Sequence, residues 1–597
     1  MCPHFYYGKI RFKWESPSGH QLAAYLYIPQ NATKDTPENA TKDTPAPGVV
    51  TIEGWYNNKE MQDLYSIELA RRGYVVLALD LHSHGDSESL SIAELYDGAV
   101  GVDGAVQLIA SLPYVDTARI RVTGHSSGGT AANMAVEIDN SRETPLIAAV
   151  LQQAGDWQDD TGGDHSGDYG SRSVGIIAST HDDFYFGTYD DAGNMLTNPA
   201  AFMETDGAKK FLNFNEDGFA GIAEGGKYYT RDFDGKTAYR VIYRPNMIHP
   251  LVAFSTTCVG YAVDFFDTTL GAPKPLPASD QIWPIKAVFN SLGVIGLLIF
   301  MVSFTLVLLD TPVFSALRSG EIVQPAPVQD SGAKAWYWVL LIIGAVFSGS
   351  SFLFCMNTVY SKTTNFFVQT GPLTIGTWAA LCGVFAIFCS AVFYGAYGKK
   401  HGWSARRAGL YLNLEQLWKT IALAVIVIVV SFGLVFAAHY FFQVDYRMYV
   451  VAFKTFGADK VLIALRYLPF FLLFYVMNSI SANCFNYNTI GGKNGNILIY
   501  AFFNTLGAIF VVASQYIYFY ATGYQLYGLT EGQRIGPIWL FPCMVLLFVT
   551  PIMSRIIYKR TRNPYIAGLI NAMFIVMISC SNTTTILGGG ELIATTF

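Results

Sequence analysis

Charged residues are scarce in this chain of 597 residues. Asp, Glu, Lys and Arg together make up 14% of the sequence, whereas hydrophobic residues make up 51%. So little charge excludes a protein that is soluble along its whole length. The net charge of −6 and the lack of any Lys/Arg-rich tract also argue against a nucleic-acid partner.

The cysteines lack the spacing of a metal or redox motif. None of the eight forms a C-x-x-C pair. Five lie inside apolar runs, namely Cys355, Cys382, Cys389, Cys543 and Cys580. This distribution excludes a disulfide framework and a cysteine-based zinc site, and it leaves the redox compartment open.

The hydrophobic residues are unevenly distributed along the chain. Residues 1 to about 280 are ordinary charged sequence, whereas repeated apolar runs begin at about 283. We expect a soluble domain over 1–270, a Pro-rich linker over 271–283 and a multi-pass helical domain over 284–597. The expected spans are about 284–309, 336–356, 372–397, 418–442, 460–481, 496–521, 537–558 and 564–586.

Strand and helix patterns alternate in the soluble domain. Residues 48–53 and 74–79 are short apolar runs typical of buried strands, and residues 60–72 between them have helical periodicity. Strands that alternate with helices indicate βαβ units and a mostly parallel sheet. Catalytic groups in such a sheet gather at the carboxyl ends of the strands.

A seven-residue turn, Thr-Gly-His-Ser-Ser-Gly-Gly, lies between a strand pattern and a helix pattern within residues 119–136. A strand, a G-x-S-x-G sequence and a helix form the nucleophile elbow, in which the central serine is held in a strained conformation. The register assigns Ser126 as the nucleophile, because the next serine would put His125 at a required glycine position. Gly124 and Gly128 flank Ser126 where a Cβ atom would clash.

The soluble domain resembles the α/β-hydrolase family, in its dienelactone hydrolase and prolyl-oligopeptidase-like branch. The residues that carry the resemblance are Glu53-Gly54-Trp55, the run from Asp80 to Ser87, and the run from Tyr114 to Ile120 that leads into Gly124–Gly129. The resemblance implies an α/β-hydrolase domain with a mostly parallel sheet, followed here by an all-α transmembrane bundle of about eight helices. Family members usually carry His-Gly where this chain has Glu53-Gly54, and many carry glycine where Ser83 stands.

The resemblance also implies the remaining catalytic groups. The family order along the chain is serine, acid, histidine. Asp182 follows a late buried strand and fits the acid, with Asp183 as the alternative, and His249 follows the last strand and fits the general base. The oxyanion donors expected are the backbone N–H groups of Ser127 and Trp55, with Tyr56 as the alternative to Trp55.

Two other features near the expected site have alternative interpretations. Asp80, His82, His84 and Asp86 crowd one loop and could in principle bind a metal, but the same loop is a structural turn in the family. We therefore expect neither a metal nor a cofactor. The long insertion 184–236 between acid and histidine is expected to cap the active site.

The basic residues in the loops predict the orientation in the membrane. The richer set comprises Arg318, Lys334, Lys399, Lys400, Arg406, Arg407, Lys419, Lys493, Arg555, Lys559, Arg560 and Arg562. The poorer set comprises Lys286, Lys362, Arg447, Lys454, Lys460 and Arg534. We expect the richer side to be cytoplasmic and the hydrolase domain to face outside. Residues 1–40 contain no secretory signal, which conflicts with that orientation.

These features predict a membrane-tethered serine hydrolase that cleaves a carboxylic ester through an acyl-enzyme. Because the Pro-rich linker is short, the catalytic domain should lie close to the bilayer and accept a lipid-like or long-acyl substrate. An acyltransferase or a peptidase with the same triad is the alternative enzyme. A transporter or receptor with a degenerate hydrolase domain is the non-enzymatic alternative. The expected partners are the acyl substrate and membrane lipids.

Overall fold

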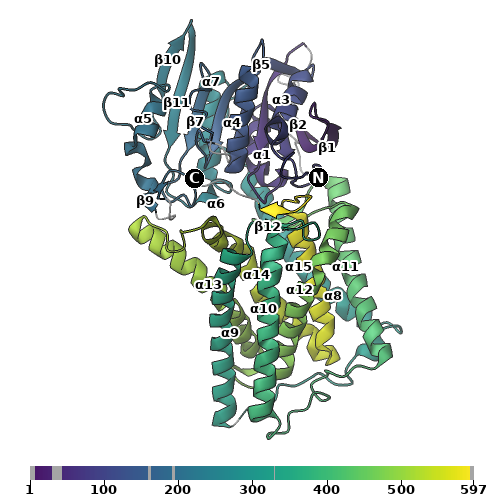
Figure 1. The fold of residues 1–597 in the computed structure, drawn as a ribbon. Helices are drawn as coiled ribbons and strands as arrows, with labels where there is room; N and C mark the ends of the chain where they lie inside the picture. Colours follow the sequence, from purple (N-terminus) through teal and green to yellow (C-terminus); the bar gives the residue numbers. More distant parts are fainter. Residues whose placement is uncertain (1–6, 30–42, 159–162, 191–194, 329, 592–597) are drawn as a thin grey trace.

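The computed structural model describes residues 7–29, 43–158, 163–190, 195–328 and 330–591. The chain forms a sheet domain stacked end to end on a helical domain (Figure 1). The boundary between the two falls in the segment that precedes Trp283, the first residue of a long apolar helix. This arrangement places the expected catalytic residues at the junction of the two domains.

A nine-stranded sheet organises the first domain, in the order β1-β2-β4-β3-β5-β6-β7-β11-β10. The strands are β1 (Tyr7–Glu15), β2 (Gln21–Pro29), β3 (Ala46–Ile52), β4 (Val75–Asp80), β5 (Val115–His125), β6 (Ile147–Gln153), β7 (Ser173–Ile177), β10 (Tyr229–Phe233) and β11 (Lys236–Tyr243). β3 to β7 and β11 are parallel to one another, and β1, β2 and β10 are antiparallel additions at the two edges. This is the expected α/β-hydrolase architecture.

Helices cover both faces of the sheet, which explains why the central strands are apolar without alternation. α3 (Val102–Ser111) and α4 (Ser127–Asn140) pack on one face with strand residues such as Val50. α1 (Asp63–Arg71) and α7 (Thr256–Leu270) pack on the other face with residues such as Val49. The shorter elements are η1 (Lys59–Gln62), α2 (Asp97–Val100), β8 (Thr188–Tyr189), β9 (Met195–Thr197), η2 (Pro199–Glu204), α5 (Asp206–Leu212) and α6 (His249–Val252).

Eight helices in the described part of the second domain are long and apolar enough to cross a membrane. They are α8 (Trp283–Leu309), α9 (Ser331–Thr358), α10 (Thr370–Phe393) with its π-helical end η4 (Tyr394–Gly398), α11 (Leu414–Phe442), α12 (Ala458–Ile480) with η5 (Ser481–Phe485), α13 (Gly492–Thr522), α14 (Glu531–Thr561) and α15 (Pro564–Ser581). Each expected span overlaps one of these helices, although α15 ends at Ser581 and not at residue 586. The turn η3 (Ser315–Leu317) and two short strand pairs, β12 (Lys362–Thr363) with β15 (Gly590–Glu591) and β13 (Tyr446–Met448) with β14 (Val451–Phe453), complete the domain.

The connection between α10 and α11 is irregular. Residues 401–416 have an amphipathic pattern, but residues 399–413 form turns and the helix begins only at Leu414. Gly402 and Gly409 have positive φ angles of 73° and 79°, which end regular helix at both points. Asn413 then caps α11 through a capping box with Gln416.

The Pro-rich linker is held against the sheet domain. Arg72 donates hydrogen bonds to the backbone carbonyls of Leu276, Pro277 and Asp280. Glu68 accepts from the backbone N–H groups at the start of α8, those of residues 282 and 283. The sheet domain is therefore fixed at the entry of the first apolar helix.

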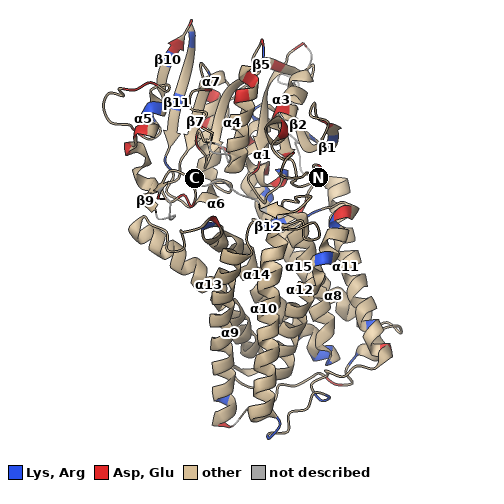
Figure 2. Cartoon of the chain, in the orientation of Figure 1, with Lys and Arg blue, Asp and Glu red and all other residues tan. Residues whose placement is uncertain are grey.

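Buried ion pairs also join the two domains. The Lys454 ammonium lies 3.0 Å from a carboxylate oxygen of Glu60, and both side chains are almost fully buried. Lys286 on α8 bonds the carboxylate of Asp63 on α1. Figure 2 shows charged residues spread over the sheet domain and its junction, while the helical domain is largely uncharged between its ends. Charge is thus used to fix how the two domains dock.

Candidate active site

The expected nucleophile turn is present between β5 and α4. Ser126 has φ 55° and ψ −128°, a conformation that residues other than glycine rarely adopt. A Cβ atom at Gly124 would lie 2.2 Å from the backbone of Gly128, and one at Gly128 would lie 2.3 Å from the carbonyl oxygen of Glu53. The flanking glycines are therefore required sterically, as the motif predicts. The tight turn projects Ser126 at the carboxyl end of the sheet.

His249 and Asp182 meet at the same end of the sheet. Asp182 follows β7, and His249 is the first residue of α6 after β11. His249 Nδ1 lies 2.9 and 3.0 Å from the two carboxylate oxygens of Asp182. The Asp182 side chain is fully buried and also accepts from the N–H groups of Phe184 and Tyr185. These bonds fix the carboxylate so that it can orient the imidazole.

Asp183 is placed differently from its neighbour. One of its carboxylate oxygens accepts from the backbone N–H of His249 at 3.2 Å, and the other has no hydrogen-bond partner. Burial raises its pKa well above the usual range, and the charge of Asp182 raises it further. A carboxyl that contacts only the backbone of the histidine cannot orient the ring. The geometry therefore favours Asp182 over Asp183 as the acid.

The side chain of His125, within the elbow itself, does not compete with His249. Its Nε2 lies 3.3 Å from the carbonyl oxygen of His249. Burial lowers the pKa of His125 to about 3, and the nearby His249 lowers it in the same direction. His125 therefore stays neutral, and its other ring nitrogen, Nδ1, has no hydrogen-bond partner among the described residues.

The loop after β3 brings the expected oxyanion donors beside the nucleophile. A Cβ atom at Gly54 would lie 3.1 Å from Ser126 Cβ, so this loop approaches Ser126 as closely as a glycine allows. Ser127 is the first residue of α4, where backbone N–H groups have no partner within the helix. The N–H of Tyr56 instead donates to Thr584 Oγ1 at 3.3 Å. Trp55 and Ser127 remain the favoured pair of donors.

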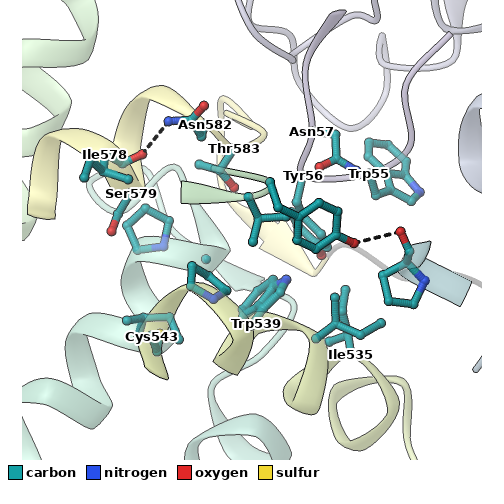
Figure 3. Close-up of a pocket in the computed structure, with 18 of the residues that line it drawn as sticks. Trp55, Tyr56, Asn57, Ile535, Trp539, Cys543, Ile578, Ser579, Asn582 and Thr583 are labelled. Atoms are coloured by element: carbon teal, nitrogen blue, oxygen red, sulfur yellow. Dashed lines mark hydrogen bonds between the residues drawn. The ribbon is translucent and has the colours of Figure 1, made fainter. Parts of the chain in front are cut away.

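A cavity of about 250 Å³ joins these residues. Ser126, Ser127 and His249 line it together with Gly54 and Trp55. Most of its remaining wall comes from the helical domain, and Figure 3 shows Trp55, Tyr56 and Asn57 facing residues of α14 and the end of α15. The labelled residues from that side are Ile535, Trp539, Cys543, Ile578, Ser579, Asn582 and Thr583.

This cavity corrects the expectation that the insertion 184–236 caps the site. Of the residues of that insertion that the structure describes, only Phe184 lines the cavity. The described parts of the insertion pack instead beside the sheet, where Phe202 and Phe211 join one of its cores. The helical domain occupies the position of a cap, because the sheet domain docks on it with the carboxyl ends of its strands.

The segment after α15 is a part of the site that sequence reasoning missed. Besides accepting from the Tyr56 N–H, Thr584 Oγ1 lies 3.0 Å from His84 Nε2, and the His84 ring stacks on Trp55 with centroids 4.9 Å apart. Asn58 of the same loop bonds Asn582 at 3.1 Å. A run of threonines at the end of an apolar helix is a weak sequence signal. Only the tertiary structure identifies this support of residues 54–58, the loop after β3 that carries the expected donor Trp55 (the oxyanion loop).

Three of the four residues of the candidate metal loop have hydrogen-bond partners of their own, whereas neither ring nitrogen of the fourth, His82, has one in the described part of the chain. Asp80 and Asp86 both accept from the Lys59 ammonium, and Asp80 also accepts from the backbone N–H of Lys59 and of Asp86. His84 binds Thr584, as described above. Within the described ranges, no three His, Cys, Asp or Glu side chains are grouped to hold a metal ion. Ser83 has φ 66°, which explains why glycine suits this position.

No family model and no curated protein matches the sequence. Solved structures with partial similarity include a hypothetical protein from Pseudomonas aeruginosa, at 14% identity over 45% of this chain and 96% of that chain with a TM-score of 0.31. An esterase from Pyrococcus furiosus matches at 11% identity over 44% of this chain and 94% of that chain with a TM-score of 0.29. An epoxide hydrolase from an endophytic Streptomyces matches at 17% identity over 24% and 37% with a TM-score of 0.19. Similarities this low leave the chemistry to be argued from the site itself.

Proposed function

We propose that the protein is a membrane-embedded serine hydrolase that cleaves carboxylic esters. One observation carries the proposal: a strained Ser126 and a histidine bound by a buried aspartate line the same cavity. Ser126 is the nucleophile, His249 the general base and Asp182 the residue that holds the imidazole in the required tautomer. A metal or a cofactor is not needed for this reaction.

The mechanism follows from these positions. Ser126 Oγ attacks the ester carbonyl while His249 Nε2 accepts the hydroxyl proton, and the N–H groups of Ser127 and Trp55 stabilise the oxyanion. The alcohol leaves with the proton from His249, and the acyl group stays on Ser126. Water then attacks the acyl-enzyme by the same route. We favour esters over amides because an amide nitrogen needs a better-placed acid to leave.

The setting of the enzyme is part of the proposal. Eight long apolar helices are compatible with a multi-pass membrane protein. The loops and helix ends rich in Lys and Arg lie at the end of these helices away from the sheet domain, and they include Arg318 and Arg406. We infer that this end is cytoplasmic and that the catalytic domain is on the outer face.

Covalent labelling tests the assignment of the nucleophile. A fluorophosphonate probe should label the purified full-length protein, and the modified peptide should carry the probe on Ser126, because only an activated serine reacts rapidly. Ser126→Ala should abolish labelling and ester hydrolysis together. Ser127→Ala, which keeps the backbone donor, should retain labelling.

Two results would contradict this assignment. Labelling that persists in Ser126→Ala would place the reactive serine elsewhere. A wild-type protein that neither reacts with the probe nor hydrolyses any ester would support the transporter or receptor alternative. Transfer of the acyl group to an added alcohol in preference to water would instead identify an acyltransferase.

A further inference from the structure

The cavity that starts at Ser126 continues into the helical domain along an apolar path. Six residues of α10, α12 and α14 line this part, namely Trp378, Ala379, Cys382, Phe474, Cys543 and Leu547. None of these side chains carries a charge. Apolar groups that enter this part from water gain free energy in proportion to the area they bury.

A second cavity adjoins the first. It has a volume of about 110 Å³ and lies among α9, α10, α12 and α13. Cys382 and Phe474 line both cavities, so these two side chains form the partition between them. The two cavities together follow the direction of the helices, from the sheet domain toward the opposite end of the helical domain.

The polar groups of the first cavity are gathered near the oxyanion loop, and its arginine and its glutamate both have hydrogen-bond partners. Arg447 donates to Asp445 at 2.8 Å and to Asn58 at 3.1 Å. Glu531 accepts from the hydroxyl of Tyr360. Apart from the two histidines, these are the charged side chains among the described residues that line the cavity. This polar end of the cavity, the mouth, suits an uncharged polar group, because its arginine is already paired and offers no free cation to a phosphate.

We propose that the helical part of the cavity is an acyl-chain site, and that the substrate is an uncharged ester of a straight-chain fatty acid. This inference rests on the proposed function. The ester carbonyl lies at Ser126, the chain runs between α10, α12 and α14, and the small alcohol occupies the polar mouth. The Cys382–Phe474 partition sets the longest chain that fits before the second cavity must open.

The chain-length profile of the full-length protein tests this site. In one detergent, kcat/KM for p-nitrophenyl acetate, butyrate, octanoate, laurate and palmitate should rise by up to about fourfold per added methylene, until the chain reaches the partition. Ala379→Leu fills the path and should lower the laurate-to-acetate ratio by about tenfold. Ala380→Leu, the neighbouring position outside the cavity lining, is the matched control and should keep the wild-type ratio.

A second variant enlarges the path instead of blocking it. Cys382→Ala removes part of the partition and should raise the palmitate-to-octanoate ratio about tenfold. Cys580→Ala, a buried cysteine that lines neither cavity, is its control. Because each comparison is a ratio of two substrates in the same detergent, micelle effects cancel between variants.

The outcomes separate this inference from the proposed function. A flat chain-length profile that neither Ala379→Leu nor Cys382→Ala changes, in a protein that hydrolyses acetate, overturns the acyl-chain site and leaves the hydrolase. Chain dependence on alkyl acetates but not on fatty-acyl esters assigns the site to the alcohol and overturns the proposal. Faster hydrolysis of phosphatidylcholine than of the neutral esters overturns the uncharged class. A protein inactive on every ester, and unlabelled by fluorophosphonate, refutes the hydrolase itself.

Discussion

The sheet domain and the helical domain contribute to one site in different ways. The sheet domain places Ser126, Asp182 and His249 through short loops at the ends of three parallel strands, β5, β7 and β11. The helical domain contributes most of the cavity wall, through side chains scattered over four helices and their connections. Reactive groups need a defined local geometry, and short sequence motifs determine such geometry. A binding wall needs only shape and apolarity, which many sequences supply.

The two domains also differ in how polar groups are buried. In the sheet domain, carboxylates near the junction pair with lysines, as Asp80 does with Lys59. In the helical domain, neutral groups pair instead, as Asn478 does with Asn504 at 2.6 Å. Ion pairs fix how the two domains dock. Neutral pairs cost less desolvation free energy when they are buried between apolar helices. We therefore expect that different mutations can change catalysis, the docking of the two domains and substrate binding separately.

The largest effect is expected in the sheet domain. His249→Ala should lower kcat by about a millionfold, and Asp182→Asn by about ten-thousandfold, as in other triads. Asp183→Asn should cost far less, because its carboxylate reaches only the backbone N–H of His249. Stopped-flow or steady-state assays on a short ester measure all three. Equal small losses in Asp182→Asn and Asp183→Asn would mean that another residue is the acid.

The junction should be the most sensitive site for stability. Glu60→Gln leaves the buried Lys454 without its carboxylate, and breaking a buried pair costs about 3–5 kcal/mol. Thermal unfolding in detergent, followed by tryptophan fluorescence, measures the change. Glu415→Gln is the control, because Glu415 pairs with Lys419 at the exposed start of α11 and should change stability by less than about 1 kcal/mol. Equal losses in both variants would show that the junction is no more sensitive than the surface.

The sequence predicts the sheet domain well because its signals are local. The turn around Ser126 needs small residues on both sides, and the structure shows those glycines in contact with backbone. Each apolar run of bilayer length likewise corresponds to one helix. The roles of Asp182 and His249 depend on which strands are neighbours, so the sequence yields them only through the resemblance. The structure brings the two together, and their catalytic roles stay a prediction.

What the sequence does not predict is where the two domains meet. Thr584 lies more than five hundred residues from Tyr56, and no periodicity or spacing connects them. The insertion 184–236 is long enough to be a cap, yet the cavity lies between the sheet domain and α14. Docking of a sheet on a helical domain depends on surface shape and on single ion pairs such as Glu60–Lys454. A single sequence contains no local signal of either.

A moderate effect on turnover is expected where the helical domain supports the oxyanion loop. Thr584→Val keeps the shape of the side chain but removes the acceptor for the Tyr56 N–H and the contact with His84. Loss of one such hydrogen bond should lower kcat about tenfold and leave KM within about twofold, because we propose that this loop donates to the oxyanion of the transition state. Thr305→Val, whose buried hydroxyl donates to the backbone carbonyl of Met301 within α8, should match the wild type. A wild-type kcat in Thr584→Val would show that this segment does not position the donors.

The smallest expected effect is on the pH dependence of stability, and it should come from the sheet domain rather than the helical domain. Burial raises the pKa of Asp156, in the loop after β6, to about 7, and the charges of Asp182 and Asp164 raise it while the N–H of Gln158 lowers it. An unfolded Asp titrates near 3.9, so between about pH 4 and 7 the folded state binds a proton that the unfolded state lacks. This contribution to stability is complete below pH 4 and is lost as the pH rises through 7.

The side chain in Asp156→Asn stays neutral and can still accept from the Gln158 N–H. The stability of this variant should therefore not fall over this pH range. Its Tm should match the wild type near pH 4 and exceed it by about 2–5 °C at pH 8. Asp310→Asn, an exposed carboxylate at the far end of α8, should leave the pH dependence of Tm unchanged. Tm curves that stay parallel between pH 5 and 8 for wild type and Asp156→Asn would show that Asp156 is ionised in the folded protein. The pH dependence would then have to come from other carboxyls of the sheet domain, of which Asp183 is the next candidate because it is fully buried beside Asp182.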